Sequence, residues 1–323
     1  MPDSHTRADL PKAVLYSWPV SVWCSVPRLA LVEKGYGSEE IIIKAVDISK
    51  GDQFSTAFLR LNPHGTVPTL VVPLERSLGP DEESQFRALR DSVTITDFID
   101  SSRSPLSKTN TTSSAPAPSL SPATIEGSNI SKAIISLLHD SKGADPNFLK
   151  RSARTPAELQ AGKAVNTALF ANRQEAIEAS LSEQPEGVTS KLRTFLEGRS
   201  ESNKVSLDIW SKGAESVHAK EFMESSKTLW EVTLPDTFKK LDELIIGPFC
   251  LGDQLSVADL HLAAWLARAV SVCGGTAKAE DVEKVEEKIG LQEFKIGQKV
   301  KMFWAAMIVR PSFKAVYPGG VLH

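Results

Sequence analysis

The chain has 323 residues, of which 41% are hydrophobic and 24% are charged, and this balance predicts a soluble globular protein of one or two domains. Its net charge of −3 at neutral pH does not favour nucleic acid or an anionic membrane as a partner. No apolar run reaches the roughly 18 residues that can span a bilayer. These bulk properties exclude membrane proteins and basic nucleic-acid binders from the expected classes.

Residues 1–12 are polar and lack the apolar core of a signal peptide, so a flexible N-terminus and a cytoplasmic protein are expected. The three cysteines, Cys24, Cys250 and Cys273, are widely spaced and odd in number. Their spacing matches neither a disulfide framework nor a zinc motif. We therefore expect reduced thiols and no bound metal.

Short apolar runs bounded by turn residues predict four strands, at residues 13–16, 40–47, 69–72 and 86–89. Helical patterns lie within residues 21–35, 54–61 and 92–99. Gly35 is a suitable residue to end the first of these helices. Strand–helix–strand followed by strand–strand–helix is the order of a thioredoxin-like domain, with a mixed sheet covered on both faces. This domain is assigned to residues 13–100.

The start of the first helix has two interpretations. If the helix begins after Ser21, Pro27 is near its sixth residue and removes one backbone hydrogen bond. If Ser25 is the N-cap, Pro27 lies comfortably in the first turn and Ser21 lies on the preceding loop. Both place Ser21 near the helix N-terminus.

Between residues 101 and 128 the composition changes to Ser, Thr, Pro and Ala. Such a segment does not bury enough apolar surface to offset its ordering entropy, so a surface insertion or linker is expected, with a phosphorylated regulatory segment as the alternative. A polar loop is expected at 73–84.

The remaining residues, 129–323, have almost entirely helical patterns. Thr155-Pro156 reads as an N-cap followed by proline at the first helical position, and Ser256 with Asp259 forms a capping-box pattern. One helix is expected to begin at residue 155. Further helices are expected around 130–139, 164–181, 189–197, 219–244, 256–270, 279–289 and 297–309.

Two motifs carry a resemblance to a known family. The stretch Asn62-Pro-His-Gly-Thr-Val-Pro-Thr-Leu70 resembles the cis-proline loop, N-P-x-G-x-V-P-x-L, of the thioredoxin-like domain of glutathione S-transferases. Residues 252–259, Gly-Asp-Gln-Leu-Ser-Val-Ala-Asp, resemble the motif before the central helix of that family's second domain. The resemblance extends over 13–100 and 129–318. It implies an α/β thioredoxin-like domain with a mixed four-stranded sheet, followed by an all-α helical bundle.

The resemblance implies a glutathione site made by two segments of the thioredoxin-like domain. The backbone of Val67, before a cis Pro68, would pair with the cysteinyl part of glutathione, and Thr66, with His64 beside it, would meet the glycyl carboxylate. Asp91 and Ser92, which open a helix, would hold the γ-glutamyl end. Helix N-termini bind carboxylates for the same physical reason.

The resemblance also implies a catalytic residue. The stretch Arg28-Leu-Ala-Leu31 aligns Ser21 with the serine of the theta-, phi- and zeta-like classes. A hydroxyl donor and a helix N-terminus together favour a thiolate, which is the nucleophilic form of glutathione. A purely structural N-cap remains the alternative for Ser21. Tyr16, Ser17 and Cys24 are the other candidates, although Cys24 also reads as a buried small hydrophobe.

The implied activity is glutathione transfer to a small hydrophobic electrophile, in detoxification or secondary metabolism, by a cytoplasmic homodimer. Side chains within 134–139, with Trp18 and Trp23, are expected to line the electrophile pocket. The stretch Asp145-Pro-Asn-Phe-Leu149 is typical of fungal members. The alternative is a catalytically weak binding or regulatory protein with the same fold. His139, His218 and His261 are interpreted as solvated or core histidines rather than metal ligands.

Overall fold

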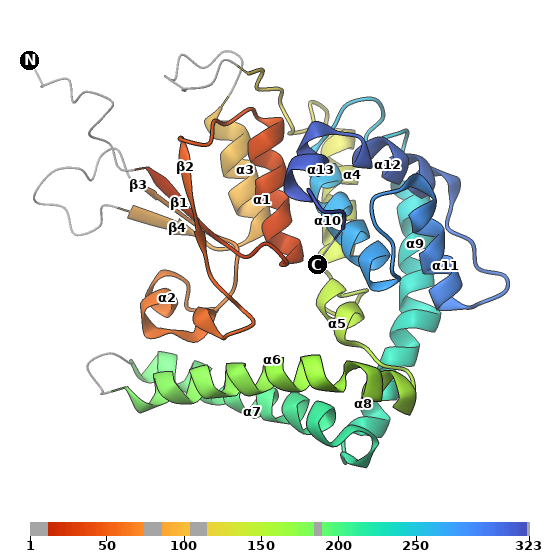
Figure 1. The fold of residues 1–323 in the computed structure, drawn as a ribbon. Helices are drawn as coiled ribbons and strands as arrows, with labels where there is room; N and C mark the ends of the chain where they lie inside the picture. The colour runs from red at the N-terminus through yellow and green to blue at the C-terminus, as the bar shows by residue number, and fades with distance from the viewer. Residues whose placement is uncertain (1–11, 74–85, 104–114, 184–188, 322–323) are drawn as a thin grey trace, which may run out of the picture.

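The computed structural model describes residues 12–73, 86–103, 115–183 and 189–321 of the chain. A four-stranded sheet with its helices forms the N-terminal part, and a mostly helical region follows (Figure 1). This confirms the predicted fold class, a thioredoxin-like domain followed by helices. Among the described residues, no helix combines the length and the apolar character needed to cross a membrane.

The sheet has the strand order β2-β1-β3-β4. β1 and β2 are parallel, whereas β1/β3 and β3/β4 are antiparallel. Leu15, Leu70 and Leu89 are opposite one another on adjacent strands and are buried, so this row forms the centre of the sheet's packed face. All four strands lie where the apolar runs predict them: β1 (Ala13–Ser17), β2 (Ile41–Ala45), β3 (Thr69–Pro73) and β4 (Phe86–Leu89).

Helix α1 (Val22–Glu33) begins directly after Ser21, so the first of the two interpretations is correct and Pro27 is its sixth residue. The helix ends at Gly35 as expected, with φ of 65°. The N–H groups of Gly35 and Tyr36 donate to the carbonyls of Val32 and Leu31, both at 2.9 Å. This paired arrangement is a Schellman motif, which requires the left-handed conformation that glycine adopts readily.

Within 101–128, the described residues contradict the expectation that this composition buries little apolar surface, since Ala117 and Leu120 are buried. Helix α3 (Ser92–Ser102) extends into this range and α4 (Ile125–His139) begins within it. Between them, Leu120 is 2% exposed and its N–H donates to Asp100 at 2.9 Å. The Lys34 ammonium donates to the Pro118 carbonyl at 2.7 Å. Polar side chains of the thioredoxin-like part satisfy this backbone, and composition does not reveal such partners.

Helix α10 (Val257–Val272) is the centre of the helical region and is buried along almost its entire length. The predicted helix over 219–244 contains a π-helical turn, Leu229–Thr233, directly before Pro235 at the start of α9. Proline lacks the N–H that a regular α-helix requires, which accounts for the altered turn. The surrounding helices are α5 (Pro146–Arg151), α8 (Ala219–Thr228), α9 (Leu234–Leu244), α11 (Glu283–Ile289), α12 (Gln298–Ile308) and α13 (Pro311–Val316).

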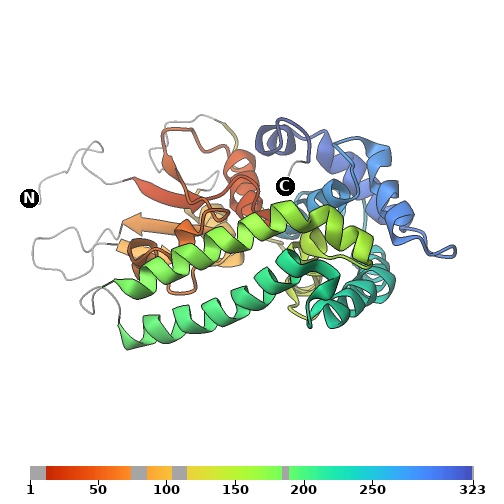
Figure 2. The same cartoon turned by 60° about the horizontal axis from the view of Figure 1, so that its bottom comes forward.

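Two long helices, α6 (Pro156–Ser182) and α7 (Ser190–Lys212), form an antiparallel hairpin beside α2 (Thr56–Leu61), as Figures 1 and 2 show. The expected helices from 155 and over 164–181 are one helix, and the helix expected at 189–197 continues to Lys212. Ile177 and Leu196 of the hairpin form a buried cluster with Phe54 and Leu59. The hairpin therefore supports the segment that leads into the Asn62–Pro68 loop.

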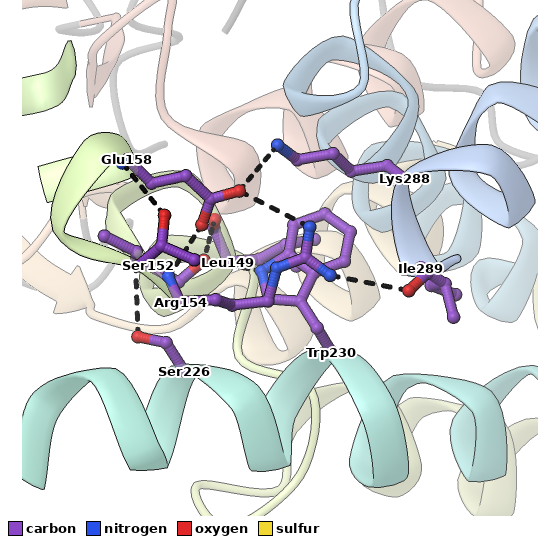
Figure 3. A network of polar contacts seen from close by, with 10 residues as sticks. Leu149, Ser152, Arg154, Glu158, Ser226, Trp230, Lys288 and Ile289 are labelled. Atoms are coloured by element: carbon purple, nitrogen blue, oxygen red, sulfur yellow. Dashed lines mark hydrogen bonds and ion pairs between the residues drawn. The ribbon is translucent and has the colours of Figure 1, made fainter. Parts of the chain in front are cut away.

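A polar network anchors the base of this hairpin (Figure 3). Glu158, in the first turn of α6, accepts from the Arg154 N–H at 2.6 Å and from Lys288 at 3.0 Å. The Arg154 guanidinium lies over the Trp230 ring, 5.2 Å from its centroid. The Trp230 indole N–H donates to the Ser152 hydroxyl at 2.8 Å. These contacts join α6 to the π-helical turn and to α11, so the hairpin is held at its root as well as along its length.

Candidate functional site

A cavity of about 540 Å³ lies between the thioredoxin-like part and α4. One wall comes from the loop before β3 and from the start of α3, and the opposite wall comes from α1 and α4. The lining residues are Trp23, Thr66, Val67, Pro68, Arg90, Asp91, Ser92, Val93, Lys132, Ile135, Ser136 and His139. The cavity thus joins segments that are far apart in the sequence.

Asn62 holds the loop that forms one wall. It is fully buried, and its amide nitrogen donates to the Thr66 carbonyl at 2.8 Å and to the Thr66 and Thr69 hydroxyls at 3.0 Å each. Its amide oxygen accepts the N–H of His64 at 3.0 Å. The Val67–Pro68 peptide bond is cis. A single buried amide therefore fixes the path of the chain from His64 to Thr69.

We expect Asn62→Ala to lower the free energy of unfolding by about 2–3 kcal/mol, because the loop loses the four hydrogen bonds of one buried amide. Urea unfolding measures this loss. Glutathione affinity, measured by calorimetry, should fall in the same variant, since the loop that contributes Thr66 and Val67 to the cavity is no longer fixed. His64→Ala serves as the control because the His64 side chain is exposed. Equal stability of the two variants would contradict the role of Asn62.

Asp91 and Ser92 form the start of α3, as predicted. Asp91 is the N-cap, and its carboxylate accepts the N–H of Thr94 at 2.8 Å. Ser92 is 4% exposed and still lines the cavity. The neighbouring Arg90 donates from Nε to the Leu61 carbonyl at 2.9 Å, so it connects this turn to the loop of Asn62. The two segments that the sequence predicts for glutathione are therefore directly linked.

Ser21 is the N-cap residue of α1, but its side chain makes no capping hydrogen bond and it is not among the residues that line the cavity. Burial raises the pKa of the Cys24 thiol, against hydrogen bonds from Ser21, Trp18 and Ser17 that lower it. Cys24 is fully buried and is free of any disulfide. Cys24 therefore fits the small-hydrophobe interpretation. Trp23, two residues after Ser21, is the cavity-lining residue of α1.

Five of the seven predicted site residues line the cavity, and Ser21 and His64 do not. Sequence reasoning missed Arg90 and Lys132 as lining residues. Lys132, Ile135, Ser136 and His139 follow the i, i+3, i+4, i+7 spacing of one helix face. That face is opposite to Ile134 and Leu138, which are buried. The same periodicity that indicated the buried face of α4 could have identified the cavity face.

Two histidines meet at the edge of the cavity: His261 is a core residue and His139 is exposed, as expected, but their contact with each other was not predicted. His139 Nε2 and His261 Nδ1 are 2.9 Å apart. The His139 ring stacks on Trp23, with centroids 3.8 Å apart and planes at 23°. Desolvation of the His139 ring lowers its pKa, against Asp91, which raises it. Full burial, together with His139, lowers the pKa of His261 well below its usual value. Both rings are therefore neutral at neutral pH.

The cavity contains two cations and one acid, namely Arg90, Lys132 and Asp91. Its apolar surface comes mainly from Trp23, Val93 and Ile135. Across residues 12–73, 86–103, 115–183 and 189–321, no group of three or more His, Cys, Asp or Glu side chains is arranged to hold a metal ion. Charged side chains therefore lie on both walls, Arg90 and Asp91 at the start of α3 and Lys132 on α4, with apolar surface beside them.

Comparison with protein families matches residues 15–106 to the N-terminal domain of glutathione S-transferase. This range extends from β1 to just beyond α3 and contains the loop of Asn62 and the start of α3. No curated protein matches the chain in sequence. The family assignment of the thioredoxin-like part therefore rests on this domain match.

Solved structures share the fold across the whole length. The beta-etherase LigF from a Sphingobium strain is 16% identical, with 95% of this chain and 99% of that chain covered and a TM-score of 0.57. A glutathione transferase from Populus trichocarpa is 15% identical, with 96% and 99% covered and a TM-score of 0.50. A maleylacetoacetate isomerase from Anaeromyxobacter dehalogenans, solved with glutathione in its active site, is 16% identical, with 95% of each chain covered and a TM-score of 0.47. For the first two, the likeness at these identities shows the fold alone.

Proposed function

We propose that the chain is a glutathione transferase, which binds glutathione and activates its thiol for attack on a small hydrophobic electrophile. The match of residues 15–106 to the N-terminal domain of glutathione S-transferase supports this proposal. The cavity carries this proposal. It brings together Val67–Pro68 and Asp91–Ser92, the two segments expected to hold glutathione, and places them opposite the apolar and polar face of α4. Glutathione bound at the first wall would meet the electrophile bound at the opposite wall.

The charges of the cavity support glutathione as the co-substrate. Glutathione has two carboxylates and one ammonium group. The cavity offers the Arg90 and Lys132 cations, the Asp91 carboxylate and the N-terminus of α3. Carboxylates are stabilised by cations and by helix N-termini, and an ammonium group is stabilised by an acid. No metal is part of this proposal.

We propose Ser21 as the group that stabilises the thiolate. It is the N-cap of α1, where the positive end of the helix favours an anion. Its hydroxyl makes no capping hydrogen bond, so donation to the sulfur would replace only its hydrogen bond with the Cys24 thiol. The electrophile is proposed to arise in detoxification or secondary metabolism, and a cytoplasmic homodimer is the proposed state of the protein.

The second candidate function is a glutathione-binding or regulatory protein with weak catalysis. The position of Ser21 favours it, since this residue lies outside the cavity lining and hydrogen-bonds to the buried Cys24 thiol. A transferase requires the hydroxyl to reach the sulfur of glutathione, whereas a binding protein does not.

We expect the wild-type protein to bind glutathione and to show thiolate absorbance at about 240 nm. Ser21→Ala should bind glutathione with similar affinity but lose the thiolate absorbance, and its kcat/KM should fall about 10²-fold. Calorimetry and absorbance at about pH 6.5 and about pH 8 measure these properties. Ser25→Ala is the matched control, because Ser25 is a buried hydroxyl of the same helix turn. Binding without a thiolate in the wild type would favour the second candidate, and absence of binding would reject both.

A further inference from the structure

We infer that His139 is a catalytic residue, and that it donates a hydrogen bond to an oxygen of the electrophile as negative charge develops there. The inference rests on the proposed glutathione transferase function and names the substrate class of that site. The expected electrophile is an α,β-unsaturated carbonyl compound, which adds the thiol across its double bond.

The position of His139 meets the first requirement of such a role. It is the last residue of α4 and lines the cavity beside Ile135 and Ser136. Its ring stacks on Trp23, the second residue of α1. The turn of α1 that would meet the sulfur of glutathione therefore also holds the His139 ring, which places this imidazole next to the expected reaction centre.

The hydrogen bond to His261 determines which nitrogen of His139 faces a bound molecule. Nε2 of His139 is engaged with Nδ1 of His261 at 2.9 Å. Within the described parts of the chain, Nδ1 of His139 has no hydrogen-bond partner, and the residue is exposed at the cavity. Nδ1 is thus the nitrogen available to a substrate.

The surroundings of His261 indicate which of its two ring nitrogens carries the proton. This residue is fully buried, and its Nε2 has no hydrogen-bond partner in the described structure. A buried N–H without an acceptor is rarer than a buried acceptor without a donor. We therefore assign the proton of His261 to Nδ1, where it is donated to His139 Nε2. A neutral imidazole that accepts at one nitrogen carries its proton on the other, so His139 presents Nδ1–H to the cavity.

The step balances without an oxidant or a further co-reactant. The glutathione sulfur bonds to the β-carbon, and the C=C electron pair moves so that charge develops on the carbonyl oxygen. His139 Nδ1–H donates a hydrogen bond to that oxygen and stabilises the enolate. The α-carbon then takes up from solvent a proton equivalent to the one that the glutathione thiol released, which restores the carbonyl form. His261 acts only as a positioning residue, because it holds the tautomer and the orientation of His139.

The decisive experiment compares two electrophiles. Benzylideneacetone develops charge on its carbonyl oxygen, whereas benzyl chloride loses chloride, which needs no proton. His139→Phe keeps an aromatic ring on Trp23 and removes both nitrogens. We expect its kcat/KM with benzylideneacetone to fall about 30- to 100-fold and its kcat/KM with benzyl chloride to change by less than about three-fold. Glutathione affinity by calorimetry and the thiolate absorbance should stay at wild-type values.

Conservative variants separate chemistry from packing. His139→Asn keeps a side-chain N–H near the place of Nδ1 and should recover part of the activity with benzylideneacetone. His261→Leu should reproduce the selective loss, and His261→Asn, which retains a donor near the place of Nδ1, should reverse it in part. Circular dichroism confirms that each variant is folded.

Each outcome decides the inference. An equal loss with both electrophiles, or no loss with benzylideneacetone, would overturn the role of His139 while leaving the transferase intact. A wild-type protein that turns over benzyl chloride but not benzylideneacetone would also overturn the role of His139. A wild-type protein that binds no glutathione would reject the proposed function together with this inference, and the calorimetry distinguishes that result from the others.

Discussion

We expect Asp259→Ala to lower the free energy of unfolding by about 3–5 kcal/mol, because a buried carboxylate that accepts several hydrogen bonds is removed. Asp259 is fully buried at the start of α10. Its carboxylate accepts the N–H of Cys250, the N–H of Ser256 and the hydroxyl of Ser256, all at 2.6 Å. Without it, two buried N–H groups lose their acceptor and the central helix loses its N-terminal anchor.

Urea unfolding measures this change, and Asp236→Ala is the matched control. Asp236 is also an acid in the first turn of a helix, α9, but its side chain is exposed. An exposed acid near a helix N-terminus is worth about 0.3–1 kcal/mol, so the control should lose no more than that. A similar loss for both variants would show that Asp259 contributes only a charge near a helix end.

The second large effect is expected for Lys34→Met, which should lower the free energy of unfolding by about 3–5 kcal/mol. The Lys34 ammonium and the Asp100 carboxylate are 2.8 Å apart and their side chains are only 1% and 5% exposed. Asp100 also accepts from the N–H groups of Leu120 and Ser121, both at 2.9 Å. Removing the lysine leaves a buried carboxylate charge without its cation.

The loss should depend on pH in a defined direction. Burial by itself raises the pKa of Asp100, but hydrogen bonds from Lys34, Ser121 and Leu120 hold it below its usual value. Such a carboxyl stabilises the fold above its unfolded pKa of about 3.9, and this contribution disappears as the pH falls through the folded pKa. In Lys34→Met the pKa of Asp100 should rise. The difference from wild type should then shrink on acidification, as Asp100 takes up a proton.

A surface pair provides the comparison for this variant. Lys12 and Glu39 are 3.4 Å apart, with side chains 47% and 78% exposed. Lys12→Met should change the free energy of unfolding by less than about 1 kcal/mol. The double variant Lys34→Met/Asp100→Asn should be more stable than Lys34→Met, because the unpaired charge is gone. A double variant that is less stable would contradict the assignment of the loss to that charge.

Local signals in the sequence identified most elements of both parts. Proline and glycine punctuation located the four strands and the end of α1. Thr155 accepts from the Glu158 N–H at 3.2 Å, which confirms the predicted N-cap of α6. Asp91 caps α3 in the same way. These features depend on residues within a few positions of one another, so the sequence contains all that is needed to predict them.

The candidate site was predictable in part. The segments around Val67 and Asp91 line the cavity as the family resemblance implied, because each presents mainly backbone and cap groups whose positions follow from local geometry. The role of Asn62 in holding the loop was not foreseen, although this residue belongs to the motif. Its partners Thr66 and Thr69 are close in sequence, but only the folded loop shows that its amide reaches them.

Local sequence patterns were enough to predict the four strands, most of the helices and the two segments that line the cavity, because these depend on contacts between near neighbours. Only the tertiary structure decided that His139 meets His261, 122 positions away, and that Lys34 reaches residues 84 positions further along. It also decided that α6 and α7 pack against the segment before Asn62. Such contacts depend on how helices pack in space, and neither periodicity nor composition specifies which distant side chains then come together.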